Sequence, residues 1–176
     1  TIMQGSGEVS KLVTIHDEIN DIAPHMLHFL ENHDEQRIAS PDFAGSAQKG
    51  KPALAVSALI SSSPTLLYFG QDVGEDGSEE TGFGDPTRTS IFDYVGVPAH
   101  QRFMNDGKFD AGKSTEDEKA LHQFYQDVMA IAATNPAVTG EYQSLHALNL
   151  DVKDSAYTEQ QFAFVRAQGE HGFVVV

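Results

Sequence analysis

Two short apolar runs, separated by a stretch of small residues, constrain the fold of this 176-residue chain most strongly. His25–Glu31 and Thr65–Phe69 have the composition of strands, and Pro52 suits the first turn of a helix that continues through Ala53–Ser62. Strand, helix, strand at this spacing predicts a βαβ unit with parallel strands and a right-handed connection. Because such strands are apolar on both faces, we expect both faces to be covered.

Two longer segments have the apolar spacing of helices. Glu8–Ile22 predicts an amphipathic helix, and Thr115–Thr134 predicts a second one with Ser114 as its N-cap and acidic residues in its first turn. Asn135–Pro136 should end the second helix. Its apolar stripe is expected to be helix core, and it consists of Leu121, Phe124, Tyr125, Val128 and Ile131.

The pattern changes after Gly140 from helices to short strands. Gly169–Gly172 reads as a hairpin turn between the last two of three strand-like runs. The runs are Tyr142–Leu148, Gln161–Ala167 and Phe173–Val176. We therefore expect an α/β part, residues 1–138, followed by an all-β part, residues 139–176, with both parts incomplete because each end of the chain reads as interrupted.

The charge balance limits the classes of partner. Eleven Lys and Arg stand against 26 Asp and Glu, which gives a formal charge of −15. Nucleic-acid binding needs clustered basic residues, so we expect no nucleic-acid partner. No apolar run approaches the roughly 20 residues that span a bilayer, so we expect no membrane partner. The chain has no cysteine. Periplasm, cell exterior and cytoplasm all stay open as its location.

Polar side chains follow the first predicted strand without a break. Asn32, His33 and Asp34 come directly after it, and the carboxyl ends of parallel strands open onto the loops where α/β proteins build their sites. Asp72 follows the second strand, and neighbouring strands lie about 4.8 Å apart. By spacing alone, Asp34 and Asp72 suit the pair of carboxylates of a retaining glycosidase, about 5–5.5 Å apart, or are two ordinary loop acids.

Two metal-binding alternatives follow from the remaining polar residues. His25, His28 and His33 suggest a metal site, but His25 and His28 point to opposite faces of a strand and cannot share an ion without distortion. The acidic run Glu75–Glu80 suggests a calcium site, but its spacing matches no known calcium loop and favours a flexible solvated loop. We predict no metal ligands and treat structural calcium as an unsupported alternative.

Four segments in order resemble one known family. Phe29–Asp34 resembles the fourth signature region of the α-amylase family of glycoside hydrolases (family 13), including its Asn-His-Asp core, and Arg37 fits the same pattern. Ser63–Asp72 is similar to the eighth barrel strand of that family, with Asp72 where the family usually has Glu. The other two segments resemble the following loop of the maltodextrin-degrading branch, Arg88–Tyr94, and the start of the β-sandwich, Phe162–Arg166.

The resemblance implies a fold and an activity. The fold is the last two βα units of a (β/α)₈ TIM barrel plus the first strands of a carboxyl-terminal antiparallel β-sandwich. The implied whole enzyme hydrolyses α-1,4-glucans or maltooligosaccharides with retention and needs no cofactor. The segments that carry the nucleophilic Asp and the acid/base Glu in that family have no counterpart here. We therefore expect this piece to be inactive alone and to fold beside its missing amino-terminal barrel half, or by self-association.

The resemblance also assigns roles to individual residues. Asp34 corresponds to the carboxylate that grips sugar hydroxyls and stabilises the transition state, and His33 donates a hydrogen bond to the same sugar. The further substrate-binding candidates are Asn32, Arg37, Asp72 and Arg88, of which Arg37 better suits positioning of the loop or of neighbouring acids. Two alternatives stay open: a glucan-transferring enzyme of the same family, and a non-catalytic carbohydrate-binding or interaction module.

Overall fold

The computed structural model describes residues 2–78, 89 and 96–176. Its contacts divide the chain into two compact units, each interleaved in sequence. The first unit consists of Thr1–His28, Ala55–Thr65 and Val128–Val176, and the second consists of Phe29–Leu54 and Leu66–Asp127. The predicted division at residue 138 stays a prediction.

The predicted strand, helix, strand order is present. Strands β1 (His28–Phe29) and β2 (Thr65–Leu66) form a two-stranded sheet, and helix α2 (Gly50–Leu59) lies between them in the chain. Both strands are much shorter than predicted, and among the described residues each pairs only with the other. Each strand also exposes an apolar side chain, with Phe29 45% and Leu66 36% exposed. These two side chains are thus only partly covered by the described residues, and their cover by the expected amino-terminal barrel half stays a prediction.

The residues before β1 form a helix and a turn. Helix α1 (Lys11–Ile19) lies within the predicted span Glu8–Ile22 but is shorter at both ends. Ala23–His25 then forms a 3₁₀ turn that contains Pro24, so the predicted strand starts later than His25. Proline fixes a backbone dihedral that suits the first turn of a helix, which accounts for the delayed start of the strand.

Helix α4 (Glu116–Thr134) confirms the second predicted helix. Its N-cap is Thr115 and not Ser114: the Thr115 hydroxyl accepts the amide of Glu118 at 3.2 Å, and the Glu118 carboxylate accepts the amide of Thr115 at 2.9 Å. This reciprocal capping box needs Thr and Glu three residues apart, a spacing that Thr115 satisfies. Within the predicted core stripe, Leu121, Tyr125 and Val128 are buried, Phe124 is half-buried and Ile131 is exposed.

The end of α4 also agrees with the sequence. Asn135 accepts the amide of Ala137 through its side chain at 3.0 Å, and a 3₁₀ helix, Pro136–Thr139, follows at once. Helix α3 (Pro98–Met104) had no counterpart among the predicted elements. It is too short to show a helical apolar period, and it ends at Asn105 in the left-handed backbone region.

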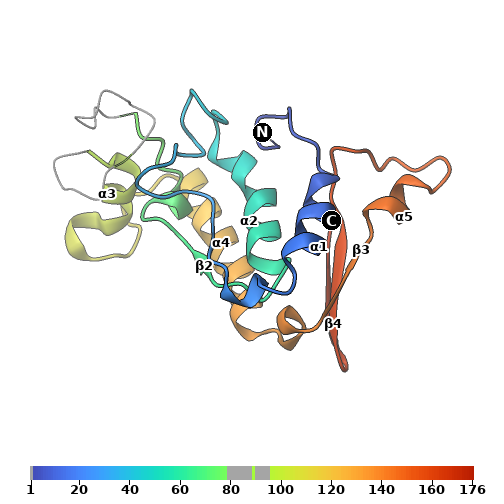
Figure 1. Cartoon of the computed structure of the whole chain (residues 1–176). Coiled ribbons are helices and arrows are strands. Elements are labelled where there is room, and N and C mark those ends of the chain that lie inside the picture. The colour runs from blue at the N-terminus through green and yellow to red at the C-terminus, as the bar shows by residue number, and fades with distance from the viewer. Residues whose placement is uncertain (1, 79–88, 90–95) are drawn as a thin grey trace. The chain divides into compact units, whose positions relative to one another are not determined.

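The last part of the first unit is an antiparallel sheet in the order β3-β4-β5, drawn in orange and red in Figure 1. Its strands are β3 (Glu141–Ser144), β4 (Phe164–Gln168) and β5 (His171–Val175). Gln168 pairs with His171, so Gly169 and Glu170 form the hairpin turn. The predicted hairpin is confirmed. The prediction of a strand over Tyr142–Leu148 is wrong in its second half, because helix α5 (His146–Leu150) begins there.

A buried arginine fastens this sheet to the preceding segments of the same unit. Arg166 donates from Nη1 to the carbonyl of Ile60 at 2.7 Å, and from Nε and Nη2 to the carbonyls of Ala137, Val138 and Gly140. Burial lowers the pKa of Arg166. Helix α1 lies beside the same sheet (Figure 1). The centroids of the His16 and Tyr142 rings are 3.8 Å apart.

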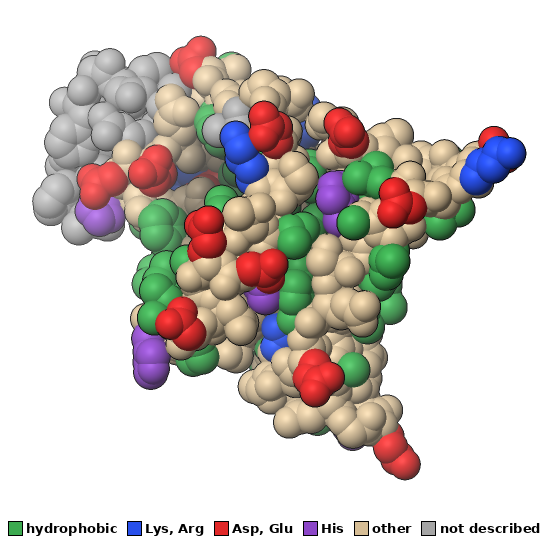
Figure 2. Space-filling view, turned by 45° about the vertical axis from the view of Figure 1, so that its right-hand side comes forward, with side chains coloured by type: hydrophobic (Ala, Val, Ile, Leu, Met, Phe, Trp, Pro, Cys, Tyr) green, Lys and Arg blue, Asp and Glu red, His purple; other side chains and the backbone are tan. Residues whose placement is uncertain are grey.

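The surface is acidic in the part of the chain that the structure describes. Asp and Glu side chains are spread over the face shown in Figure 2, and the described residues form no basic patch on that face. No described helix is both long enough and apolar enough to cross a membrane.

Candidate functional site

The loop after β1, residues 32–36, presents an adjacent histidine and aspartate to solvent. The Asn32 side-chain oxygen accepts the amides of Asp34 at 2.8 Å and Glu35 at 2.9 Å, which fixes the backbone in an Asx turn. His33 Nε2 lies 3.3 Å from Asp34 Oδ2, and these side chains are 53% and 74% exposed. The loop therefore carries an exposed carboxylate and an exposed imidazole next to each other, on a backbone that the Asx turn fixes.

A buried ion pair closes the base of this loop. Glu31 Oε2 accepts from Arg37 Nη1 at 2.9 Å, and Glu31 Oε1 accepts from the amide of Ile38 at 2.7 Å. Both charged side chains are almost completely buried. Arg37 was predicted among the substrate-binding candidates, and its burial favours the positioning role that the sequence also suggested. Glu31 belonged to the same motif but was not predicted as a site residue.

Arg37 also connects the loop after β1 to two later segments of the second unit. Its guanidinium carbon lies 4.5 Å from the centre of the Tyr68 ring and 5.1 Å from the centre of the Phe69 ring. Its Nε donates to the Thr89 hydroxyl at 2.9 Å, and the Tyr68 hydroxyl donates to the Thr89 carbonyl at 2.7 Å. The predicted candidate Arg88 lies outside the described residues.

A second buried carboxylate contributes to the charge balance around Arg37. Burial raises the pKa of Glu31, and the positive charge of Arg37 offsets this only in part. Burial also raises the pKa of Glu75, although the amides of His100 and Ala99 and the charge of Arg37 act in the opposite direction. Each carboxylate therefore holds its proton more tightly than an exposed glutamate does.

Glu75 corrects the prediction of a solvated acidic loop. Its Oε2 accepts the amides of Ala99 at 2.9 Å and His100 at 3.2 Å, which caps the start of α3, and the side chain is buried. Asp76 accepts the amide of Ser78 at 3.0 Å. The remaining acids of the predicted run, Glu79 and Glu80, lie outside the described residues.

Asp72, predicted as a substrate-binding candidate, pairs with a residue of α4. Its Oδ2 lies 2.7 Å from His122 Nδ1, and His122 Nε2 lies 3.0 Å from the Gln126 amide nitrogen. The Asp72 side chain is 29% exposed. Asp34 is thus paired with His33, and Asp72 with His122. Sequence reasoning could not find His122, because it lies in a regular helix 50 residues away.

The histidines of the metal alternative have separate surroundings. His28 Nδ1 lies 2.9 Å from the Ser57 carbonyl oxygen, and His33 faces Asp34. Among residues 2–78, 89 and 96–176, no group of three or more His, Asp and Glu side chains is arranged to hold a metal ion.

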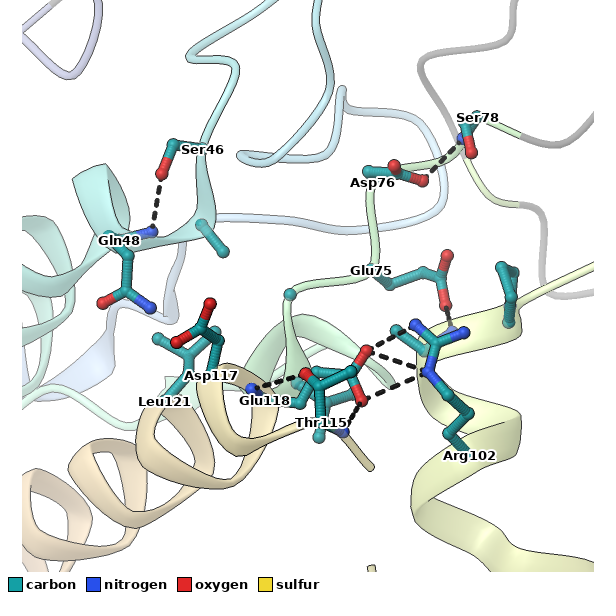
Figure 3. A pocket seen from close by; sticks show the side chains of 15 residues that line it. Ser46, Gln48, Glu75, Asp76, Ser78, Arg102, Thr115, Asp117, Glu118 and Leu121 are labelled. Atoms are coloured by element: carbon teal, nitrogen blue, oxygen red, sulfur yellow. Dashed lines mark hydrogen bonds and ion pairs between the residues drawn. The ribbon is translucent and has the colours of Figure 1, made fainter. Parts of the chain in front are cut away.

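A polar pocket of about 340 Å³ lies in the second unit, beside Glu75 (Figure 3). Asp76 and Asp117 line it together with an ion pair between Arg102 and Glu118, in which Arg102 Nε donates to Glu118 Oε1 at 3.0 Å. The described lining residues include none of the predicted site residues. The pocket is therefore distinct from the loop that carries His33 and Asp34.

Comparison with known proteins identifies the fold class but no sequence family. No protein-family model matches this sequence. No curated protein matches it either. The structure is similar to that of AmyP, an amylase, solved in complex with maltose, with a TM-score of 0.57 and 18% sequence identity over 92% of this chain. The chain spans 33% of AmyP.

At this level of identity the similarity concerns the fold. The chain has an amylase-like fold: mixed α/β, with a small antiparallel three-stranded sheet, consistent with part of a larger amylase-like molecule.

Proposed function

We propose that this chain is the carboxyl-terminal part of an α-amylase-type glycoside hydrolase of family 13. Residues 1–138 would complete its (β/α)₈ barrel, and residues 139–176 would begin its β-sandwich. The amylase-like fold supports this proposal, as does the maltose bound to the similar structure. The observation that carries it is the exposed His33–Asp34 pair, held at the end of β1 in the motif that resembles the family.

The chemistry of the pair suits an α-1,4-glucan or a maltooligosaccharide. A fixed carboxylate accepts hydrogen bonds from two adjacent sugar hydroxyls, and these bonds strengthen as the ring flattens toward an oxocarbenium-like transition state. His33 donates a further bond to the same sugar. The Oδ1 of Asn32 is used within the turn, which leaves its NH₂ group for a substrate hydroxyl.

The retaining mechanism needs two further carboxylates, a nucleophile and an acid/base. In this proposal they come from barrel strands outside this chain, so the chain is inactive alone. The exposed apolar side chains of Phe29, Leu66 and Leu67 suit contact with those strands, or with a second copy. Asp72 and Arg88 are proposed as outer substrate contacts.

Product analysis with the full-length protein and maltoheptaose tests this proposal. Hydrolysis predicts glucose and maltose, with the new reducing ends released as the α-anomer. Longer glucans would indicate a glucan-transferring enzyme, and binding without turnover would indicate a non-catalytic module. Absence of both binding and turnover contradicts an α-glucan-active protein altogether.

A further inference from the structure

We infer that Glu31 and Arg37 are positioning residues: their buried ion pair fixes the loop 32–36, and thereby the direction in which His33 and Asp34 point. The inference rests on the proposed function in so far as these two side chains grip the sugar.

One carboxylate closes the loop. The two oxygens of Glu31 accept one bond each, from Ile38 N at 2.7 Å and from Arg37 Nη1 at 2.9 Å. Both donors lie on the far side of the loop, so a single buried side chain holds its two ends together. Such bonds to a charged group are shorter and stronger than neutral ones. The base of the loop is therefore held by two buried, charge-assisted hydrogen bonds.

Asn32 connects the ion pair to the segment that carries His33 and Asp34. Asn32 follows Glu31 directly, and its side-chain oxygen holds the amides of Asp34 and Glu35. A rotation of the chain at Glu31 would displace Asn32 and break both bonds. The backbone of Asp34 is thus linked to the ion pair through two adjacent residues, Glu31 and Asn32.

The Arg37 side chain contacts three further residues of the second unit. The rings of Tyr68 and Phe69 lie beside its guanidinium, and Thr89 accepts from its Nε at 2.9 Å. Arg37 has no exposed surface, and its Nη2 is buried without a partner among the described residues. No atom of Arg37 can reach a substrate in this arrangement, so its effect on a bound sugar passes through the loop.

Three variants of the full-length protein separate positioning from a merely structural ion pair. Glu31→Gln and Arg37→Met each leave one buried charge without its partner, so both should lower the melting temperature and kcat. The double variant removes both charges, and replacing a buried ion pair by neutral groups is often neutral for stability. We expect it to recover the melting temperature while kcat for maltoheptaose stays about 10- to 100-fold below wild type, with a smaller change in KM.

Hydrogen exchange gives a readout that does not depend on activity. The amides of Asp34 and Glu35 should exchange faster in the double variant, while those of α4 keep their wild-type rates. Arg102→Met is the matched control, because it breaks another Arg–Glu pair of the same unit, and it should leave both kcat and exchange in 32–36 unchanged.

A double variant with wild-type kcat and wild-type exchange in the loop would overturn the inference. If the double variant does not fold, Glu31→Gln decides, because it keeps Arg37 and its contacts with Tyr68, Phe69 and Thr89 but removes the carboxylate that closes the loop. Faster exchange of Asp34 and Glu35 in that variant supports positioning, and unchanged exchange overturns it. If the wild-type protein does not act on maltoheptaose, the proposed function fails, and exchange alone still decides the positioning role.

Discussion

At the scale of single residues, the titratable side chains around the candidate site form an exposed group and a buried group. His33 and Asp34 are exposed, whereas Glu31, Arg37 and Glu75 are buried. In the proposed function the exposed Asp34 carboxylate accepts hydrogen bonds from sugar hydroxyls. A buried carboxylate costs free energy unless it is neutral or fully bonded, so it acts on the fold and not on a ligand.

Burial of Glu75 makes stability depend on pH. Its folded pKa lies above the ordinary value of 4.5, so the folded state binds the proton more tightly than the unfolded state. The stabilising contribution of this group is therefore fully present below about pH 4.5 and is lost as the pH rises through the raised pKa.

Glu75→Gln, which keeps an oxygen for the amides of Ala99 and His100, tests this. Between pH 4.5 and pH 7 the free energy of unfolding of the variant should rise relative to that of wild type, meaning that the variant becomes relatively more stable, as measured by urea unfolding at several pH values. Glu159→Gln, at an exposed position, serves as the control for the same change of side chain. A constant difference for Glu75→Gln would refute the assignment.

The sequence points to site residues mainly through short motifs. Asn32, His33 and Asp34 are predicted site residues because one short motif contains them, and their roles stay predictions. Thr89 contacts Arg37 across 52 positions, and Glu75 contacts Ala99 across 24. These contacts join residues that are far apart in the sequence and meet only in the folded chain. No local period or motif indicates such a contact, so these partners could not be predicted.

At the scale of elements, the long helix was the most predictable. The apolar period of α4 extends over several turns, whereas the five residues of α5 were absorbed into a predicted strand. The N-cap of α4 was misplaced by one residue. Its two neighbouring hydroxyls therefore offer a direct comparison: Thr115 caps the helix, and the Ser114 hydroxyl is buried without a hydrogen-bond partner among the described residues.

Thr115→Ala should destabilise the protein by about 0.5–2 kcal/mol, because it removes the acceptor for the Glu118 amide. Ser114→Ala should be nearly neutral or stabilising, because it removes an unsatisfied hydroxyl. Urea unfolding of both variants measures the difference. An equal or larger cost for Ser114→Ala would show that the helix is capped at Ser114.

At the scale of the whole molecule, the chain resembles one third of a larger amylase-like structure. Strands β1 and β2 expose Phe29 and Leu66, and Leu67, which directly follows β2, is exposed as well. The order β1, α2, β2 was predictable from the sequence, but the short helices α3 and α5 and the lengths of the strands were not. A strand extends only as far as its neighbours allow, and those neighbours are not encoded in the strand itself.

In the proposed function, Asp34 stabilises the transition state of glucosidic bond cleavage in the full-length protein. The kcat of Asp34→Asn for maltoheptaose tests it most directly, with Glu35→Gln as a control that makes the same charge change one residue along the same loop. We predict a loss of about 100-fold or more for Asp34→Asn, because its bonds to the sugar strengthen by several kcal/mol in the transition state. Glu35→Gln should retain a kcat near wild type. A wild-type kcat in Asp34→Asn, or an equal loss in both variants, would contradict the claim.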